Sequence, residues 1–301
     1  MDLNFFRKIR VLDGGMGQEL LARGVEANGT LWSVNALLQK KYHELVLNTH
    51  LDFIKSGAEV IVTTTFTARR KRLRENNIEN KFEYLNKIAG EIALKTKKKF
   101  PNTLIAGGLP PQNFTYQADD RNEEEIKNNF QEQARILNPY IDFFYFDVLS
   151  SLKEIKCGIE AIKEFKKPYL IGIHISEGTR LPNGDKISDV KKIINNQLLG
   201  IMLSCVSPEN FQQNLSELKS LRVPFGFKLN AYITTNTSYS ENYLKSKTGN
   251  PAEVLGKRKD LTPENMGRFA GIFKNAGATI FGGCCETTPA HIKELSKLAK
   301  K

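Results

Sequence analysis

The chain has 301 residues, of which 40% are hydrophobic and 26% charged, values ordinary for a globular protein with a substantial core. No apolar run approaches the ~20 residues that span a bilayer, and the N-terminus lacks the apolar segment of a signal peptide, so we expect no membrane association and a cytoplasmic location. The net charge of +11 comes largely from scattered lysines without interleaved aromatic residues, which argues against a nucleic-acid partner.

Short apolar runs alternate with longer helical patterns along the chain, an order typical of repeated βα units and a parallel sheet. Most runs are continuously apolar, as expected for parallel strands buried on both faces. They lie at residues 10–13, 59–64, 103–107, 142–148, 169–174, 200–204, 224–229 and 278–282. Eight such strands predict a single-domain (β/α)8 TIM barrel over residues 1–301, with a doubly wound open sheet as the alternative.

Chemically active side chains stand at or just past the ends of these strands. They are Asp13, Thr64, Asp147, His174, Cys205, Cys284 and Cys285. In either fold the carboxyl ends of parallel strands gather at one edge, which is where active sites form. We therefore expect residues from opposite ends of the chain to meet in one site.

A glycine-rich loop, Gly14-Gly15-Met16-Gly17, follows the first expected strand. Its backbone N–H groups can bind a carboxylate, as loops and helix N-termini do for anions. A tight βα turn without a ligand is the alternative interpretation. The glycine spacing does not fit the dinucleotide-binding fingerprint.

Two adjacent cysteines near the C-terminus, Cys284 and Cys285, carry the strongest chemical signal. Thr288-Pro289 is typical of a helix N-cap and first turn, so both thiols are expected on a strand-to-helix loop. The helix dipole there favours thiolate, the form that binds metals or attacks electrophiles. Cys205 precedes a similar cap, whereas Cys157 lies in a helical pattern and is expected to be a packing residue. Burial as small apolar residues is the alternative for the adjacent pair.

Three motifs together resemble the zinc-dependent homocysteine S-methyltransferase family. They are Val-Leu-Asp-Gly-Gly-Met-Gly at 11–17, Cys-Val-Ser-Pro at 205–208 and Gly-Gly-Cys-Cys-Glu-Thr-Thr-Pro at 282–289. The resemblance implies a TIM barrel that moves a methyl group from a sulfonium or ammonium donor to the thiol of L-homocysteine, giving methionine. It also implies Zn²⁺, which ionises the substrate thiol so that no general base on the protein is required.

The resemblance further implies roles for individual residues. The zinc ligands would be Cys205, Cys284 and Cys285, and the homocysteine amino acid group would be held by Asp13, Gly14, Gly15 and Asp147, with Asp147 on the amino group. Trp32, the only tryptophan, would suit a cationic donor through cation–π attraction, or would fill the core. The family often has an aromatic hydroxyl near the metal where this chain has Thr67. The sequence therefore leaves open which group occupies the fourth position of the zinc when substrate is absent.

The identity of the methyl donor is left open by the sequence. The size of the chain favours S-methylmethionine or S-adenosylmethionine, with betaine or a dimethylsulfonio compound as the alternative. Departures from the family pattern at Asp147, Ser204 and Glu286 suggest, as an alternative, a methyltransferase for another thiol or selenol acceptor. A non-catalytic zinc-binding barrel is a further alternative. The added charge of Glu286 either selects a cationic donor or faces solvent.

The least hydrophobic segment lies at about 230–260. Loops of this length within a compact domain are usually functional or mobile. We interpret the segment as a lid or a subunit contact inside the single domain, which leaves a homo-oligomer open. The expected partners are small molecules, homocysteine and the methyl donor.

Overall fold

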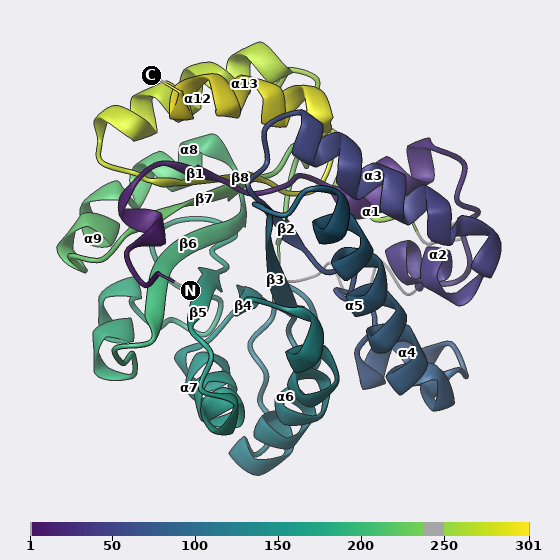
Figure 1. Ribbon diagram of the computed structural model, residues 1–301. Helices are drawn as coiled ribbons and strands as arrows, with labels where there is room; N and C mark the ends of the chain where they lie inside the picture. Colours follow the sequence, from purple (N-terminus) through teal and green to yellow (C-terminus); the bar gives the residue numbers. More distant parts are fainter. Residues whose placement is uncertain (1, 237–249, 301) are drawn as a thin grey trace.

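A computed structural model describes residues 2–236 and 250–300 and shows eight parallel strands surrounded by helices (Figure 1). The strands are β1 (Arg10–Val11), β2 (Val60–Val62), β3 (Leu104–Leu109), β4 (Phe143–Leu149), β5 (Tyr169–Ile173), β6 (Leu198–Val206), β7 (Phe225–Leu229) and β8 (Ile280–Gly283). Their order in the sheet is β1-β8-β7-β6-β5-β4-β3-β2. Each lies within two residues of an expected apolar run.

The ring of strands closes between β1 and β2. Leu12 forms an isolated parallel bridge with Val60, and the Asp13 amide donates to the Val60 carbonyl at 3.0 Å. The Glu59 amide donates in turn to the Val11 carbonyl at 2.8 Å. Because β1 also pairs with β8, the sheet has no free edge, and the predicted (β/α)8 barrel is confirmed over the open sheet.

Helices form the outer layer around the strands (Figure 1). The longer ones are α3 (His43–Lys55), α5 (Phe82–Lys99), α6 (Glu123–Leu137), α7 (Leu152–Ile162), α12 (Pro263–Asn275) and α13 (Pro289–Ala299). The shorter ones are α1 (Met16–Ala22), α2 (Asn35–Leu38), α4 (Arg70–Glu75), α8 (Pro208–Gln213), α9 (Leu215–Ser220) and α11 (Ala252–Leu255). The cap expected after Cys205 is Ser207, which accepts a hydrogen bond from the amide three residues on, and Thr262 does the same at the start of α12. Proline follows each cap, so the sequence itself sets where α8 and α12 begin.

Both faces of the strands are buried, as the continuous apolar runs predict. One set of alternate side chains packs together with Phe6 in a cluster that includes Val60, Tyr145 and Met202. The other set, with Ile61 as an example, packs in the larger cluster that also contains the apolar side chains of the surrounding helices. The barrel interior is therefore a filled core, and the pocket described below lies at its carboxyl end.

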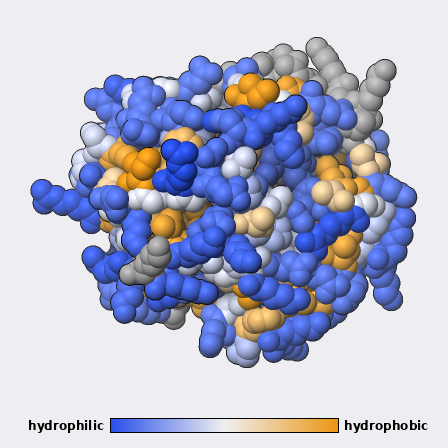
Figure 2. All heavy atoms as spheres, turned by 90° about the horizontal axis from the view of Figure 1, so that it is seen from above, coloured by the Kyte–Doolittle hydropathy of each residue, from blue (hydrophilic) through white to orange (hydrophobic). Residues whose placement is uncertain are grey.

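The surface offers no large apolar area on the face shown in Figure 2, where apolar side chains form small separate groups among hydrophilic ones. In the described part of the chain, the large hydrophobic side chains that are exposed are Leu3, Tyr84, Ile233 and Ile272, which come from well-separated segments. Within the same residues, no helix has both the length and the hydropathy needed to cross a membrane.

The polar segment expected at about 230–260 is described only in part. Residues 237–249 lie outside the described residues, so the interpretation as a lid or subunit contact stays a prediction. The flanking parts lie close to each other, because Tyr232 forms an antiparallel bridge with Lys257 and α11 lies between residue 250 and that bridge. Pro251 reaches the wall of the pocket described below.

Candidate metal and substrate site

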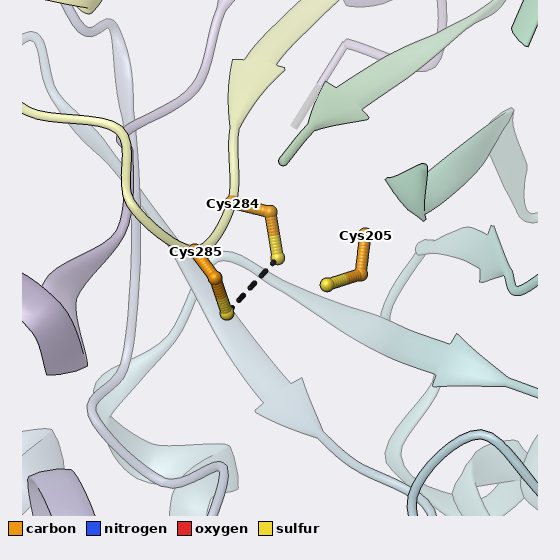
Figure 3. A group of neighbouring side chains, drawn as sticks. All are labelled: Cys205, Cys284 and Cys285. Carbon is orange, nitrogen blue, oxygen red and sulfur yellow. Dashed lines mark hydrogen bonds between the residues drawn. The ribbon is translucent and has the colours of Figure 1, made fainter. Parts of the chain in front are cut away.

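Three cysteines meet at the carboxyl end of the barrel (Figure 3). Cys205 comes from the end of β6, and Cys284 and Cys285 follow β8 directly. Their sulfur atoms lie within 4.8 Å of one another, and the Sγ atoms of Cys284 and Cys285 are 4.0 Å apart. Within the described residues no histidine, aspartate, glutamate or further cysteine completes the group. Three soft donors with an open fourth side could bind a thiophilic metal ion.

The thiols of this group do not titrate alike. Hydrogen bonding with Cys205 and Cys285 holds the pKa of Cys284 well below its ordinary value, against the effect of burial, and the positive charge of Lys228 lowers it further. Burial raises the pKa of Cys205 well above its ordinary value. The cluster thus favours one thiolate before any metal arrives, and thiolate is the form that binds metal.

Two strand irregularities aim side chains into the pocket. The pairing of β6 with β7 shifts register between Ser204 and Val206, and Cys205 between them has a left-handed backbone with φ +56°. The pairing of β4 with β5 shifts in the same way between Phe146 and Leu149, the stretch that holds Asp147. Bulges of this kind re-aim side chains beside active sites, so both residues turn toward the barrel end.

Several residues other than glycine that have a left-handed backbone lie in or beside the same pocket. Of eight such residues in the described chain, four line the pocket and a fifth follows Cys285: they are Trp32, Tyr116, Val148, Cys205 and Glu286. Each costs on the order of 1 kcal/mol, and such strain persists where surrounding structure enforces it. The fold therefore concentrates its backbone strain at this end of the barrel.

One backbone amide of the glycine loop is already used within the protein. Gly14 and Gly15 do line the pocket, but the Gly15 amide donates to the Thr287 carbonyl at 3.0 Å and to the Thr287 hydroxyl at 3.2 Å. A side chain on Gly15 would come within 2.5 Å of the Cys284 carbonyl oxygen. Gly15 thus lets the loop pack against the turn that carries the cysteines, and binding of a substrate carboxylate by the loop, through the Gly14 amide, stays a prediction.

Two acidic side chains and one lysine lie in the pocket wall. Asp13 accepts a hydrogen bond from the Val62 amide at 2.8 Å through Oδ2, while its Oδ1 lies 3.6 Å from Nζ of Lys228. Within the described residues, Oδ1 of Asp13 and Oδ1 of Asp147 have no hydrogen-bond partner. Burial raises the pKa of both carboxyls to about 6, and Lys228 opposes that rise. Oδ1 of Asp147 thus remains available to a ligand, whereas Oδ1 of Asp13 faces Lys228.

Aromatic side chains form another part of the wall. Trp32 and Phe66 meet edge to face with ring centroids 6.2 Å apart, and Trp32 donates from Nε1 to Gln18 at 3.0 Å. The Tyr116 hydroxyl lies 2.9 Å from Sγ of Cys205, and its ring lies 4.4 Å from the ring of His174. Tyr116 was not found from the sequence. It places an aromatic hydroxyl beside the cysteine cluster from the loop after β3.

A model of the homocysteine S-methyltransferase family matches residues 10–299 of the chain. The chain belongs to the homocysteine S-methyltransferase family. Homocysteine S-methyltransferase 2 of Saccharomyces cerevisiae is 26% identical over 98% of this chain and 95% of its own. Homocysteine S-methyltransferase YbgG of Bacillus subtilis is 24% identical over 96% and 94%.

The fold of this family member also resembles a solved structure. The metallated form of the homocysteine methyltransferase MmuM from Escherichia coli superposes with a TM-score of 0.78 at 22% identity, covering 97% of this chain and 96% of the other. At that identity the likeness speaks for the fold alone. The resemblance predicted from the three motifs is confirmed by the family match over nearly the whole chain.

Glu286 follows the two adjacent cysteines directly. The side chain is 7% exposed, and its carboxylate forms an ion pair with Lys257 at 2.6 Å and accepts a hydrogen bond from Gln18. Gln18 in turn holds Trp32. Glu286 therefore does not face solvent, and its charge is already neutralised by a lysine from the segment after α11.

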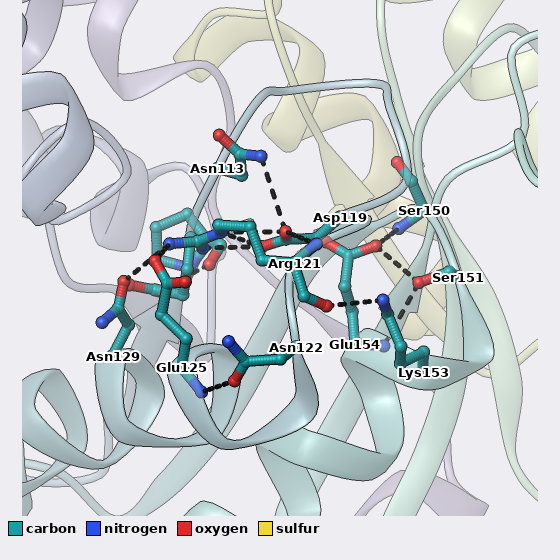
Figure 4. Close-up of polar contacts among 12 residues, drawn as sticks. Asn113, Asp119, Arg121, Asn122, Glu125, Asn129, Ser150, Ser151, Lys153 and Glu154 are labelled. Carbon is teal, nitrogen blue, oxygen red and sulfur yellow. Dashed lines mark hydrogen bonds and ion pairs between the residues drawn. The ribbon is translucent and has the colours of Figure 1, made fainter.

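A polar cluster anchors the loop that carries Tyr116 (Figure 4). Asp119, from that loop, is buried and binds the Arg121 guanidinium, with 2.7 Å between Oδ2 and Nη2. Glu154, at the start of α7, accepts hydrogen bonds from the Ser150 amide at 3.2 Å and the Ser151 hydroxyl at 2.9 Å. Lys153 donates to the Arg121 carbonyl at 2.7 Å, which ties the loop to α7.

We expect Glu154→Gln to stabilise the protein at pH 8. Burial raises the pKa of Glu154 to about 8, against ~4.3 in an unfolded chain. The folded state therefore holds an extra proton between these values, and stability falls as pH rises from 5 to 8, by about 3 kcal/mol for this group. Glutamine cannot ionise, so urea unfolding at both pH values should show a smaller loss in the variant.

The matched control for that measurement is Glu124→Gln, at an exposed position of α6. We expect the control to keep the wild-type difference in unfolding free energy between pH 5 and pH 8. Equal differences for wild type and Glu154→Gln would contradict the assignment of a protonated Glu154.

Proposed function

We propose that the protein is a zinc-dependent methyltransferase that moves a methyl group from a sulfonium or ammonium donor to the thiol of L-homocysteine, giving methionine. Family membership over residues 10–299 supports the reaction class and the acceptor. The single observation that carries the metal part is the group of three cysteine sulfurs within 4.8 Å, aimed into one pocket.

The residues present fit Zn²⁺. Cys205, Cys284 and Cys285 would hold it, since three thiolates without a fourth protein ligand are typical of catalytic zinc. The lowered pKa of Cys284 favours metal binding, because metal replaces the proton on a ligating thiol. When bound, zinc would lower the pKa of the acceptor thiol and keep its sulfur nucleophilic near neutral pH.

The chain's own residues bind and orient the substrates. Asp147, with an unpartnered buried oxygen, would accept a hydrogen bond from the acceptor's ammonium group. The Tyr116 hydroxyl, 2.9 Å from Cys205, would fix the position of that sulfur. Trp32 would face the positive charge of the donor, an interaction worth about 0.5–2 kcal/mol.

No side chain is required to remove a proton from the acceptor in this proposal. His174, which stands at the end of β5, hydrogen-bonds Ser176 at 2.8 Å and is not part of the pocket wall. Burial lowers the pKa of His174 to about 4, so it is neutral at pH 7. His174 would support the Tyr116 ring against which it packs.

S-methylmethionine or S-adenosylmethionine is our first choice of donor, and betaine or a dimethylsulfonio compound is the alternative. A methyltransferase for another thiol or selenol, or a zinc-binding barrel without activity, would be the competing functions. We propose a cytoplasmic location and small-molecule partners, and leave a homo-oligomer as a prediction. Supplying each donor with homocysteine and measuring methionine tests the function; turnover confined to another acceptor would favour the first competitor.

We expect Gly15→Ala to weaken zinc binding by about tenfold or more and to cost ~1–3 kcal/mol of stability. The added methyl group would meet the Cys284 carbonyl oxygen at 2.5 Å, and backbone there cannot move without shifting the cysteines. Zinc affinity is measured by competition with a chromogenic chelator. Gly271→Ala on α12, where nothing lies within 4 Å of the added atom, is the control and should bind zinc normally.

A further inference from the structure

Lys228 is a charged residue of the pocket that the mechanism above does not use. It lies within β7, opposite Ser204 on β6 and Gly282 on β8, in a strand whose other residues are apolar or glycine. Only 5% of the residue is exposed, and it lines the same pocket as the three cysteines. Burying an ammonium group costs free energy unless partners offset the loss of water, so a buried lysine in this pocket indicates a functional role.

Lys228 contacts one carboxylate and one aromatic ring, both at distances beyond ordinary hydrogen-bond length. Its Nζ is 3.6 Å from Oδ1 of Asp13, beyond hydrogen-bond length, and 5.5 Å from the centre of the Tyr145 ring. Burial opposes the charge, but Asp13 and Asp147 raise the pKa of Lys228 above its ordinary value. An ammonium group has three N–H donors. The ion pair with Asp13, at 3.6 Å, leaves donors of Lys228 available to a ligand in the pocket.

The acceptor brings charges that match this arrangement. Homocysteine carries an ammonium and a carboxylate on one carbon atom, and Asp147 with its unpartnered oxygen suits the ammonium. The carboxylate needs hydrogen-bond donors, and the Gly15 amide is already used by Thr287. Among the described residues that line the pocket, Lys228 is the one with a cationic side chain.

We propose that Lys228 binds the α-carboxylate of the acceptor, so that Lys228 and Asp147 together select a zwitterionic amino acid thiol. This inference rests on the proposed function, because it takes homocysteine as the acceptor. In this arrangement Asp13 keeps Lys228 oriented through Oδ1, while its Oδ2 is fixed by the Val62 amide. The specificity of the pocket then comes from a pair of opposite charges on β4 and β7.

The test compares homocysteine with 3-aminopropane-1-thiol, which is homocysteine without its carboxylate. Binding of each thiol to the zinc-loaded protein is measured by isothermal titration calorimetry, and KM and kcat are measured with the same donor. In the wild type, the carboxylate should strengthen binding about 10- to 100-fold. In Lys228→Met, that advantage should fall below about threefold, with the affinity for 3-aminopropane-1-thiol nearly unchanged and kcat less affected than KM.

Two further variants guard against a trivial loss of folding. Lys228→Arg keeps the cation and should retain most of the preference for homocysteine. If Lys228→Met alone does not fold, Asp13→Asn is compared with Asp13→Asn combined with Lys228→Met, which leaves no unpaired charge at Asp13. Here too the addition of Lys228→Met should remove the preference.

Three results would overturn the inference. Equal weakening of both thiols in Lys228→Met would make the lysine a counter-ion for the acidic groups of the pocket, without a contact to the carboxylate. Equal binding of both thiols by the wild type would mean that the carboxylate is not recognised. A wild-type protein that neither binds nor methylates either thiol would overturn the proposed function as well. This result can be told apart from the first two, because in those the wild-type enzyme is active.

Discussion

Replacing Cys205, Cys284 or Cys285 with serine should abolish methyl transfer and reduce bound zinc far below one per chain. A serine hydroxyl is a harder donor that keeps its proton near neutral pH, so two thiolates would remain where three are needed. Loss of a residue that only supports a ligand typically costs about 10–100-fold. Loss of a ligand itself should therefore lower kcat/KM by about a thousandfold or more. Zinc content and methionine formation measure the two effects.

Cys157 is the matched control for these variants. It is buried in α7 among core residues, far in sequence from the cluster, and burial raises the pKa of its thiol to about 11. Cys157→Ser should keep zinc and kcat/KM while losing ~1–2 kcal/mol of stability. A serine variant of the cluster that retains full zinc and turnover would contradict the assignment of that cysteine as a ligand.

Asp147→Asn should raise the KM for homocysteine by about 100-fold with a smaller change in kcat. Oδ1 of Asp147 is buried without a partner, and a hydrogen bond to a charged group is worth ~1.5–3 kcal/mol. Asparagine keeps the shape but removes the charge that would pair with the ammonium group. Zinc content should not change, because Asp147 is not part of the cysteine group.

Asp142→Asn is the control for this variant, because Asp142 directly precedes β4, the strand that contains Asp147. Asp142 precedes β4 and accepts hydrogen bonds from Lys97 and from the Ile105 amide, away from the pocket. This change should lower stability without moving KM. If Asp147→Asn alters kcat and zinc content but leaves KM alone, Asp147 is not the ammonium partner.

Much of the fold could be predicted because buried parallel strands leave a direct signal in the sequence. Apolar runs, most of them continuous, marked all eight strands, and the serine-proline pair after Cys205 marked where α8 begins. The site residues at strand ends could be named because a barrel brings those ends together. The bulges at Asp147 and Cys205 left no such signal, since they depend on pairing with neighbouring strands.

Other residues were missed for physical reasons. Lys228 lies inside an expected apolar run, and a lone charge in a strand buried on both faces is the signal that could have found it. Tyr116 lies in a loop with left-handed backbone, φ +67°, held by tertiary contacts that no local pattern predicts. The role of Gly15 depends on its contact with Cys284, from the other end of the chain.

The central claim is most directly tested by methionine formation from homocysteine by protein of known zinc content. Protein purified under reducing conditions should contain about one zinc per chain and form methionine with S-methylmethionine or S-adenosylmethionine. Activity should disappear when a chelator removes the metal and return when Zn²⁺ is restored. Protein without zinc, or fully loaded protein that forms no methionine from any of the four donor classes, would contradict the account.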